Sequence, residues 1–327
     1  MSGTVISLPL IALLLLVAIF GGLWLFSRRV AANVETRVPA VGKFAEVANA
    51  HLHYLERGEA RADQPPIVML HGLAGHLYHF NFALVDELAK DTRVIAIDRP
   101  GSGYSRRDYG KATKLTEQAD AIVALLGQLG IHRAVFVGHS LGGALSLTLA
   151  IRHPTRVAGL TLIAPLTHIS DRLSPVFRGI AIKGRIARVL VAHLLATPMY
   201  IINRQKIIRQ IFGPEIVPAG YATRGGGLLT LRPSQYVGAA GDLGAVPEIM
   251  PGIEARYEEL NRSDAPPIDL LYGREDRILD YRVQGEAFAA RVPACRLTLV
   301  SGGHMLPLTQ PALCAATIRA TLAAARA

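Results

Sequence analysis

Cysteine, internal repeats and low-complexity tracts are scarce or missing in this chain of 327 residues, and each shortage excludes a class of protein. The two cysteines, Cys295 and Cys314, have neither the spacing of a metal site nor the number needed for a disulfide framework. We expect both to be buried small apolar residues. The missing repeat argues against a solenoid. Because half of the residues are hydrophobic, a globular core is expected and disorder is not.

Charged residues are absent from Val5 to Phe26, an apolar run of about 22 residues. As a helix this run measures roughly 33 Å, enough to cross a hydrocarbon layer of about 30 Å. A cleaved signal peptide is the alternative, but no Lys or Arg precedes the run, which exceeds the usual signal core of about 7–15 residues. The pattern predicts a transmembrane anchor at residues 1–27 and a linker at residues 28–42.

Basic residues follow this run, and the chain as a whole carries a formal charge of +10. The positive-inside tendency predicts a single-pass membrane protein with its main part on the cytoplasmic side. The basic residues are scattered through apolar segments without a nucleic-acid motif, so no nucleic-acid partner is expected. A nearby anionic membrane surface explains the excess more simply. The basic residues that follow the run are Arg28, Arg29, Arg37 and Lys43.

Beyond the linker, the rhythm of the sequence indicates an α/β fold. The stretch "KFAEVANAHLHYLERG" alternates around a polar turn, which predicts an antiparallel hairpin. Short apolar runs ended by Gly, Pro, Asp or Ser then alternate with helix-period stretches, the pattern of a parallel sheet covered by helices on both faces. The runs are "PIVMLHG", "TRVIAIDRPG", "RAVFVGHS", "AGLTLIAPL", "IDLLYGRED" and "CRLTLVSGGH".

About a hundred residues interrupt this rhythm and contain helix-like, basic, apolar segments. We predict a first core part at 43–165, a helical lid at 166–265 and a second core part at 266–327. The apolar stretch from Ile186 to Ile202 resembles a second membrane span, but Arg188, His193 and Pro198 interrupt it. A lid packed over the core is favoured there, and membrane contact by its apolar face is the alternative.

The stretch "FVGHSLGG" places Ser140 where a buried strand ends and a helix begins. Such a turn strains the serine backbone and exposes its hydroxyl above the sheet. We expect Gly138 and Gly142 to remove side chains that would collide with neighbouring elements. A chance match or a simple helix cap is the alternative. The preceding strand and following helix supply the context that a nucleophile requires.

A serine nucleophile needs a base and an orienting carboxylate, and both candidates lie near later strand ends. His304 ends the last apolar run after two glycines and follows every plausible acid in the chain. Asp276 lies just past the turn at Gly273 and is the preferred acid. Glu275 and Asp280 are either solvated loop charges or replacements for it.

Backbone N–H groups of Leu73 and Leu141 are predicted to hold the oxyanion of a tetrahedral intermediate, with Gly72 letting the first loop turn. His71 is expected to make a structural hydrogen bond that holds this loop, and His139 to shape the pocket beside Ser140. The remaining pair, His76 and His79, is three residues apart on an expected helix but lacks a third ligand, so neither metal nor cofactor is predicted.

These residues resemble the α/β-hydrolase superfamily, whose motifs occur in order from Lys43 to Ala327. The resemblance implies an eight-stranded, mostly parallel sheet with a helical lid after the sixth strand. It also implies the roles of nucleophile, acid and base for Ser140, Asp276 and His304, and of oxyanion hole for Leu73 and Leu141. A serine where dehalogenases and epoxide hydrolases carry aspartate disfavours those activities. The matching segments are "HGLAG", "DRPGSGYS", "GHSLGG", "GREDRILD" and "GGHMLPLTQP".

The predicted function is that of a membrane-anchored serine hydrolase that cleaves carboxylic esters, lipophilic or acyl esters in particular. The anchor suggests delivery from the bilayer, although it can serve only to localise the enzyme. Hydrolysis of carbon–carbon bonds in ring-fission products and non-catalytic binding of an acyl ligand are the alternatives. The sequence leaves the physiological substrate and the oligomeric state open.

Overall fold

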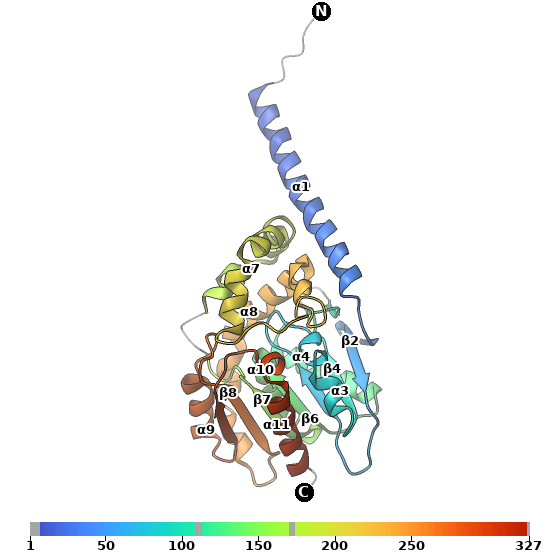
Figure 1. Cartoon of the computed structure of the whole chain (residues 1–327), viewed down its shortest axis with the longest axis vertical. Coiled ribbons are helices and arrows are strands. Elements are labelled where there is room, and N and C mark those ends of the chain that lie inside the picture. The colour runs from blue at the N-terminus through green and yellow to red at the C-terminus, as the bar shows by residue number, and fades with distance from the viewer. Residues whose placement is uncertain (1–6, 109–110, 112, 170–173, 326–327) are drawn as a thin grey trace, which may run out of the picture.

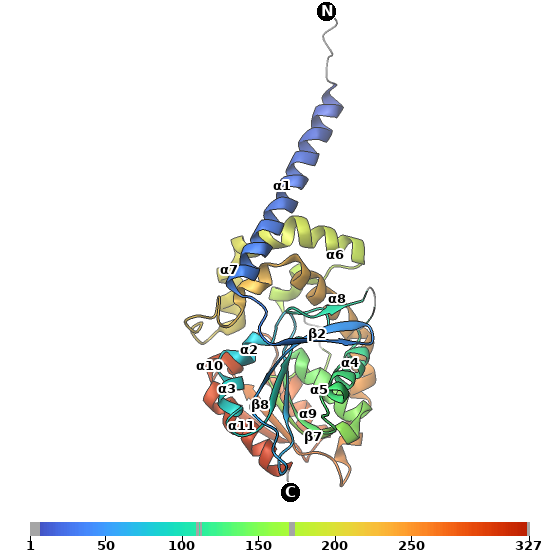
Figure 2. The same ribbon diagram turned by 90° about the vertical axis from the view of Figure 1, so that its right-hand side faces the viewer.

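The computed structural model describes residues 7–108, 111, 113–169 and 174–325. The first six residues of the predicted anchor, 1–6, lie outside the described residues. A mixed sheet lies at the centre of the body and helices cover both of its faces (Figures 1 and 2). The strands are β1 (Lys43–Val47), β2 (Ala50–Arg57), β3 (Ile67–Leu70), β4 (Val94–Ile97), β5 (Arg106–Arg107), β6 (Ala134–His139), β7 (Val157–Ile163), β8 (Ile268–Gly273) and β9 (Arg296–Val300).

The sheet order is β1-β2-β4-β3-β6-β7-β8-β9, and all neighbours from β4 to β9 pair in parallel. The predicted hairpin is present, with β1 antiparallel to β2, which is also antiparallel to β4. The mostly parallel α/β sheet is therefore confirmed. A ninth strand, β5, pairs with β2 beside this path of eight. It was not predicted because two residues, both arginine, carry no strand periodicity.

Two apolar clusters form the core, one on each face of the sheet. One contains side chains of α4, α5, α8 and α9, and the other contains side chains of α1, α2, α3, α10 and α11. Both faces are thus covered, as continuous apolar strands require. The α-helices are α1 (Leu8–Arg37), α2 (Tyr78–Asn81), α3 (Leu84–Leu88), α4 (Leu115–Gln128), α5 (Leu141–Arg152), α6 (Arg185–Val191), α7 (Thr197–Phe212), α8 (Pro233–Glu254), α9 (Ala287–Arg291), α10 (Leu306–Thr309) and α11 (Pro311–Ala324).

Helix α1 is longer than the predicted anchor, because it continues through most of the expected linker to Arg37. Its first part projects from the body (Figure 1). Val34 and Val38 are each only 2% exposed because they pack into the core, which stabilises the added turns. Ser27, directly after the apolar run, is the first buried residue among those that the structure describes in this helix.

The chain between β7 and β8 is helical in much of the part that the structure describes, and we call it the insertion. Within it α6, η3 and α7 form one 28-residue helix, Arg185–Phe212, which we call the outer helix. Most of its residues are exposed or half-buried, so it buries less of its surface against the body than a lid packed over the core would. The shorter helical turns of the chain are η1 (Pro154–Arg156), η2 (Pro175–Ile180), η3 (Ala192–Ala196), η4 (Gly227–Leu231), η5 (Tyr257–Asn261) and η6 (Arg282–Glu286).

Two helices among the described residues are long and apolar enough to cross a membrane, α1 and the outer helix. Length and composition alone are weak grounds, because a signal sequence or a core helix passes the same test. The outer helix lies across the top of the body, whereas α1 rises away from it (Figure 2).

Candidate active site

Ser140 lies at the turn from β6 into α5, with backbone angles φ 53° and ψ −119°. A non-glycine residue in this region is strained and persists only where its surroundings enforce it. Two backbone contacts of Ser140 hold the turn, because its N–H donates to the Ile163 carbonyl at 3.0 Å and its carbonyl accepts the Gly143 N–H at 2.8 Å. The sequence pattern therefore predicted both the position and the strained geometry of this serine.

The glycines around Ser140 are required by close contacts between elements. A Cβ atom on Gly142 would lie 1.9 Å from the Leu70 carbonyl oxygen, and one on Gly138 would lie 2.4 Å from the Gly142 oxygen. Helix α5 can therefore approach β3 and β6 only without side chains at these positions. This closeness sets where the serine emerges from the sheet.

Asp276 and His304, 28 residues apart, meet beyond the ends of β8 and β9. His304 Nδ1 lies 2.7 Å from Asp276 Oδ2, and both side chains are buried. Asp276 Oδ1 accepts the N–H groups of Ile278 at 2.7 Å and Leu279 at 3.0 Å, which fixes the carboxylate. Because Nδ1 donates to the carboxylate, Nε2 is the ring nitrogen left to accept a proton.

His139 connects the His304 loop to the serine turn. The two imidazole rings are 4.9 Å apart between centroids, and His139 Nε2 donates to the His304 carbonyl at 2.9 Å. Burial, followed by the nearby His304, lowers the pKa of His139 to about 3, so the ring is a neutral donor. Among the hydrogen bonds of the described residues, none joins Ser140 Oγ to His304. Such contacts often tighten only when substrate binds.

The loop after β3 passes directly beside the serine. A Cβ atom on Gly72 would lie 2.9 Å from Ser140 Cβ, so only glycine allows this approach. Ala74 has φ 54°, a left-handed conformation that turns the loop sharply. Leu73 directly follows Gly72, and Leu141, the first residue of α5, directly follows Ser140, so this approach places the two leucines close to the same turn. Both predicted donor positions therefore lie at the same end of the sheet as Ser140.

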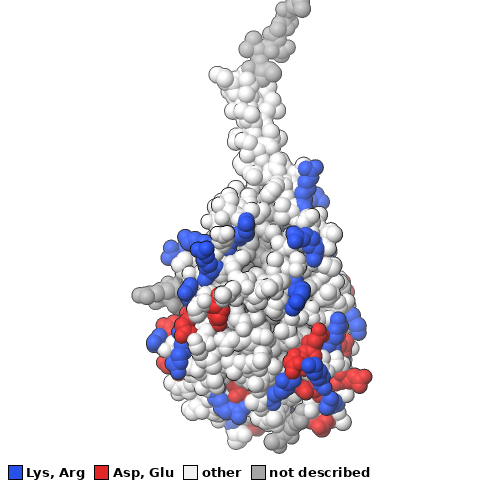
Figure 3. All heavy atoms as spheres, viewed as in Figure 1, with Lys and Arg blue, Asp and Glu red and all other residues white. Residues whose placement is uncertain are grey.

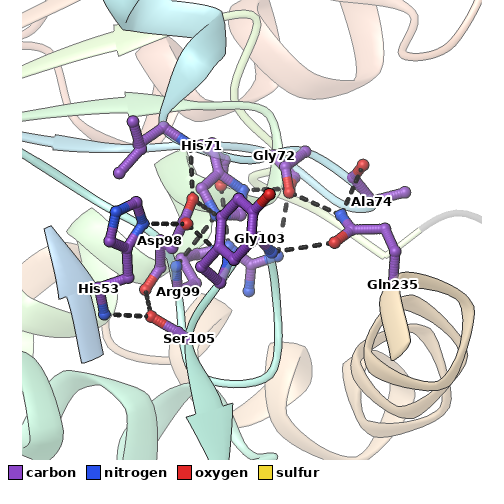
Figure 4. A network of polar contacts seen from close by, with 12 residues as sticks. His53, His71, Gly72, Ala74, Asp98, Arg99, Gly103, Ser105 and Gln235 are labelled. Atoms are coloured by element: carbon purple, nitrogen blue, oxygen red, sulfur yellow. Dashed lines mark hydrogen bonds and ion pairs between the residues drawn. The ribbon is translucent and has the colours of Figure 1, made fainter. Parts of the chain in front are cut away.

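A buried arginine that the sequence analysis did not single out holds this loop (Figure 4). Arg99 is fully buried, and its Nε and Nη2 donate to the carbonyls of His71 at 2.9 Å and Gly72 at 3.1 Å. Burial and the Arg99 charge hold the pKa of His71 well below its usual value. Neutral His71 therefore accepts the Arg99 backbone N–H at Nε2, at 3.0 Å. Its contacts are those of a residue that holds the loop.

Helix α8 of the insertion completes the same network. Gln235 Nε2 donates to the carbonyls of Ala74 at 3.0 Å and Gly75 at 2.9 Å. Asp242 accepts from Arg99 at 2.9 Å and from Arg107 at 2.5 Å, so the buried guanidinium is paired. Arg99 and Gln235 thus donate to four carbonyls of the loop, those of His71, Gly72, Ala74 and Gly75. No sequence periodicity reveals contacts across 143 or 160 residues.

Two glutamates hold the loop that carries His304. Glu275 Oε2 accepts the Gly302 N–H at 2.6 Å, and Glu215 of the insertion accepts the Gly303 N–H at 2.8 Å. Glu275 is exposed on its loop, and the contact of its carboxylate is with the backbone of Gly302, whereas Asp276 contacts His304. Asp280 instead accepts the Arg282 N–H at 2.9 Å and caps the following turn.

The remaining candidates take structural positions. His76 precedes the short helix α2 rather than lying on it, and its ring centroid is 4.4 Å from that of His79. No group of three potential metal ligands occurs among the described residues. Cys295 and Cys314 are free and buried as predicted, and burial raises the pKa of both thiols.

The chain is similar to several known proteins. Residues 65–188 match the family model described as alpha/beta hydrolase fold. The magnesium-chelatase 30 kDa subunit of Rhodobacter capsulatus is 31% identical over 248 residues, 75% of this chain and 82% of that one. An acetyltransferase component of the acetoin cleaving system of Pseudomonas putida is 40% identical over 130 residues, which are 40% of this chain and only 34% of that protein. A solved membrane phospholipase A, described as a bacterial virulence factor, is 24% identical with a TM-score of 0.66, covering 97% and 98% of the two chains.

Proposed function

Because this chain belongs to the α/β-hydrolase family, we propose that it is a serine hydrolase that cleaves carboxylic esters through an acyl-enzyme intermediate. The observation that carries the proposal is the strained Ser140 turn beside the Gly72 loop. The 2.7 Å contact between Asp276 and His304 supports it, because an oriented imidazole is the base that a serine needs.

In the proposed reaction, Ser140 Oγ attacks the ester carbonyl carbon while its proton passes to His304 Nε2. The backbone N–H groups of Leu73 and Leu141 donate to the oxyanion, and removing one such donor typically costs about 3 kcal/mol of transition-state stabilisation. His304 then protonates the departing alcohol, and the acyl group stays on Ser140. Water attacks this ester with proton transfer to His304, which releases the acid and restores the hydroxyl.

Asp276 stays ionised throughout and stabilises the imidazolium that forms at each step. Its two further N–H contacts, from Ile278 and Leu279, keep its Oδ2 aimed at His304. The carbonyl-binding side chains Arg99 and Gln235 act as positioning residues for the oxyanion loop, since neither touches the reacting atoms in this scheme.

The proposal includes a lipophilic acyl ester as substrate and a membrane anchor formed by α1. The apolar part of α1 from Leu8 to Phe26 is long enough to span a bilayer, since transmembrane helices use about 17–25 apolar residues. The helical insertion serves as a lid in this scheme, because Gln235 and Glu215 reach from it to both loops of the site.

Turnover of p-nitrophenyl esters of increasing acyl length by the full chain in detergent tests this proposal. We expect activity that rises with acyl length and falls by several orders of magnitude in Ser140→Ala. Ser263→Ala, a change at an exposed serine of the insertion, is the matched control and should behave as wild type. Thermal unfolding checks that both variants fold.

Full ester turnover by a folded Ser140→Ala protein contradicts the proposal. Wild-type cleavage of a ring-fission dienoate without ester cleavage would replace it by carbon–carbon bond hydrolysis. Absence of turnover on both substrates, with an intact fold, would favour a non-catalytic binding protein.

A further inference from the structure

The outer helix carries an apolar stripe on its solvent side, made of Ile186, Leu190, Leu195, Met199 and Ile202. Ile186 is 78% exposed and Ile202 is 75% exposed. On most protein surfaces exposed apolar side chains of this size occur singly, whereas here five of them lie along one helix. The opposite side of the helix is fixed to the body, because Ala192, Thr197 and Phe212 are buried. The helix therefore lies flat on the body and presents the stripe outward.

The spacing of the stripe follows the geometry of the helix. Its members are separated by four, five, four and three residues. The step of five spans η3, a π-helical segment at Ala192–Ala196, where a turn takes more residues than in an α-helix. The wider turn keeps Leu190 and Leu195 in line, so the five side chains form one continuous surface.

Positive charge surrounds this surface. Seven Lys or Arg residues and no Asp or Glu lie between Ser174 and Pro214. Lys183 and Arg185 are exposed at the beginning of the outer helix, and Arg204, Lys206 and Arg209 are exposed near its end. On the face shown in Figure 3, Lys and Arg predominate around the upper body below α1, whereas both signs of charge mix lower down.

A groove follows the last apolar residue of the stripe. Ile202, Lys206, Arg209 and Arg277 line it together with amide side chains, and its volume is about 420 Å³. Lys206 lies four residues after Ile202 on the same side of the helix, so the surface changes there from apolar to cationic. Among the described residues, none of these three cations takes part in an ion pair. The groove therefore offers unneutralised positive charge to an anion.

The stripe lies at the level where α1 leaves the body. Helix α1 packs beside η3 and α7. Burial, together with the nearby charge of Arg28, lowers the pKa of His193 in η3. Arg28 also stacks on Trp24 at 4.8 Å, an aromatic and basic pair typical of a membrane interface. If α1 spans a bilayer up to Phe26, the outer helix lies against the headgroup boundary of that bilayer.

We propose that the outer helix docks onto the bilayer that holds α1, with the stripe in the acyl boundary and the cationic groove on anionic phosphate headgroups. This inference rests on the anchor in the proposed function and adds a second, peripheral membrane contact to it. A second copy of the chain fits the face less well, because two-fold pairing would bring cationic helix ends together. A complete transmembrane passage of this helix would expose its buried side.

Full-length protein in phosphatidylcholine–phosphatidylglycerol vesicles provides the test. An environment-sensitive dye is attached to Leu190→Cys in the stripe, to Leu14→Cys in α1, or to Val283→Cys. Val283 is a matched control because it is apolar, 45% exposed and located in η6, near α9 and away from α1. We expect nitroxide-labelled lipids to quench the dye at positions 14 and 190 but not at 283. In the double variant Lys206→Glu, Arg209→Glu, quenching at 190 should fall severalfold while quenching at 14 persists.

Quenching at 14 with none at 190 overturns the inference and leaves the proposed anchor intact. A disulfide-linked dimer through position 190, with no lipid quenching there, assigns the face to a second copy and also overturns it. Absence of quenching at both positions contradicts the anchor itself, while ester turnover in the same sample reports on the catalytic proposal separately.

Discussion

Strand β7 and the outer helix are both rich in apolar residues, yet they occupy opposite environments. Every residue of β7, Val157–Ile163, is buried between two layers of helices, whereas the outer helix buries only one side and exposes Ile186, Leu190 and Ile202 among others. Within the same insertion, α8 behaves like the core, because Gln235 and Asp242 are almost fully buried. The hydrophobicity of an apolar segment therefore does not determine whether the segment is buried. The elements that pack against it determine its burial.

The candidate catalytic residues belong to the buried part of the molecule. Ser140, His304 and the Gly72 loop all contact elements of the sheet or α8. The outer helix contributes none of these contacts. Changes in the buried region should affect catalysis and stability, and changes in the exposed stripe should affect neither.

The largest expected effect comes from Asp276→Asn in the buried region. The amide cannot orient and stabilise the imidazole as the carboxylate does, so kcat should fall by about 10⁴-fold, as loss of an orienting aspartate does in other serine hydrolases. KM should change little. Initial rates on a p-nitrophenyl ester measure both values, and a tenfold or smaller loss of kcat would mean that Asp276 is not the orienting acid.

Asp242→Ala should destabilise the protein by about 3–5 kcal/mol, because it leaves the fully buried Arg99 without its carboxylate partner. Urea unfolding measures the loss. Asp264→Ala is the control, since its pair with Arg262 is exposed and such pairs contribute about 0–1 kcal/mol. Equal effects of the two substitutions would contradict the role given to α8.

A leucine in each region tests the comparison directly. Leu162→Ala in β7 removes a fully buried side chain and should cost about 2–5 kcal/mol of unfolding free energy. Leu190→Ala changes a side chain that is 54% exposed and should alter stability by no more than about 0.5 kcal/mol. Unfolding of both variants in detergent, where no bilayer covers the stripe, provides the values. A large cost at Leu190 would show that the stripe is covered by protein.

The smallest expected effect is a pH dependence of stability from buried histidines. Burial lowers the pKa of His76 to about 4, below its ordinary value near 6.5. Between these values the unfolded chain binds more protons than the folded one, so the free energy of unfolding decreases as the pH falls. His76→Phe should flatten this slope in urea unfolding from pH 7 to pH 4. An unchanged slope would mean that His76 is solvated or charged in the folded protein.

Much of the fold follows from local patterns. The β1–β2 hairpin, the parallel strands and the strained Ser140 turn have signals within a few residues of themselves. The pairing of His304 with Asp276 follows from chain order and strand ends, since parallel strands bring their carboxyl ends together.

Other features depend on contacts that local patterns do not encode. Glu215 and Gln235 reach the site from helices whose position on the body is set by tertiary packing. The sequence also does not predict the exposure of the outer helix, because its apolar residues are equally compatible with burial in a core. The helical continuation of α1 to Arg37 depends on the pocket that receives Val34 and Val38.

The most direct measurement of the central claim is peptide mapping by mass spectrometry after a fluorophosphonate reacts with the full-length protein. A nucleophile activated by His304 predicts one adduct on the Ser140 hydroxyl, formed much more slowly in Asp276→Asn and absent in Ser140→Ala. An adduct on another residue, or an unmodified Ser140 in folded wild-type protein, would contradict it.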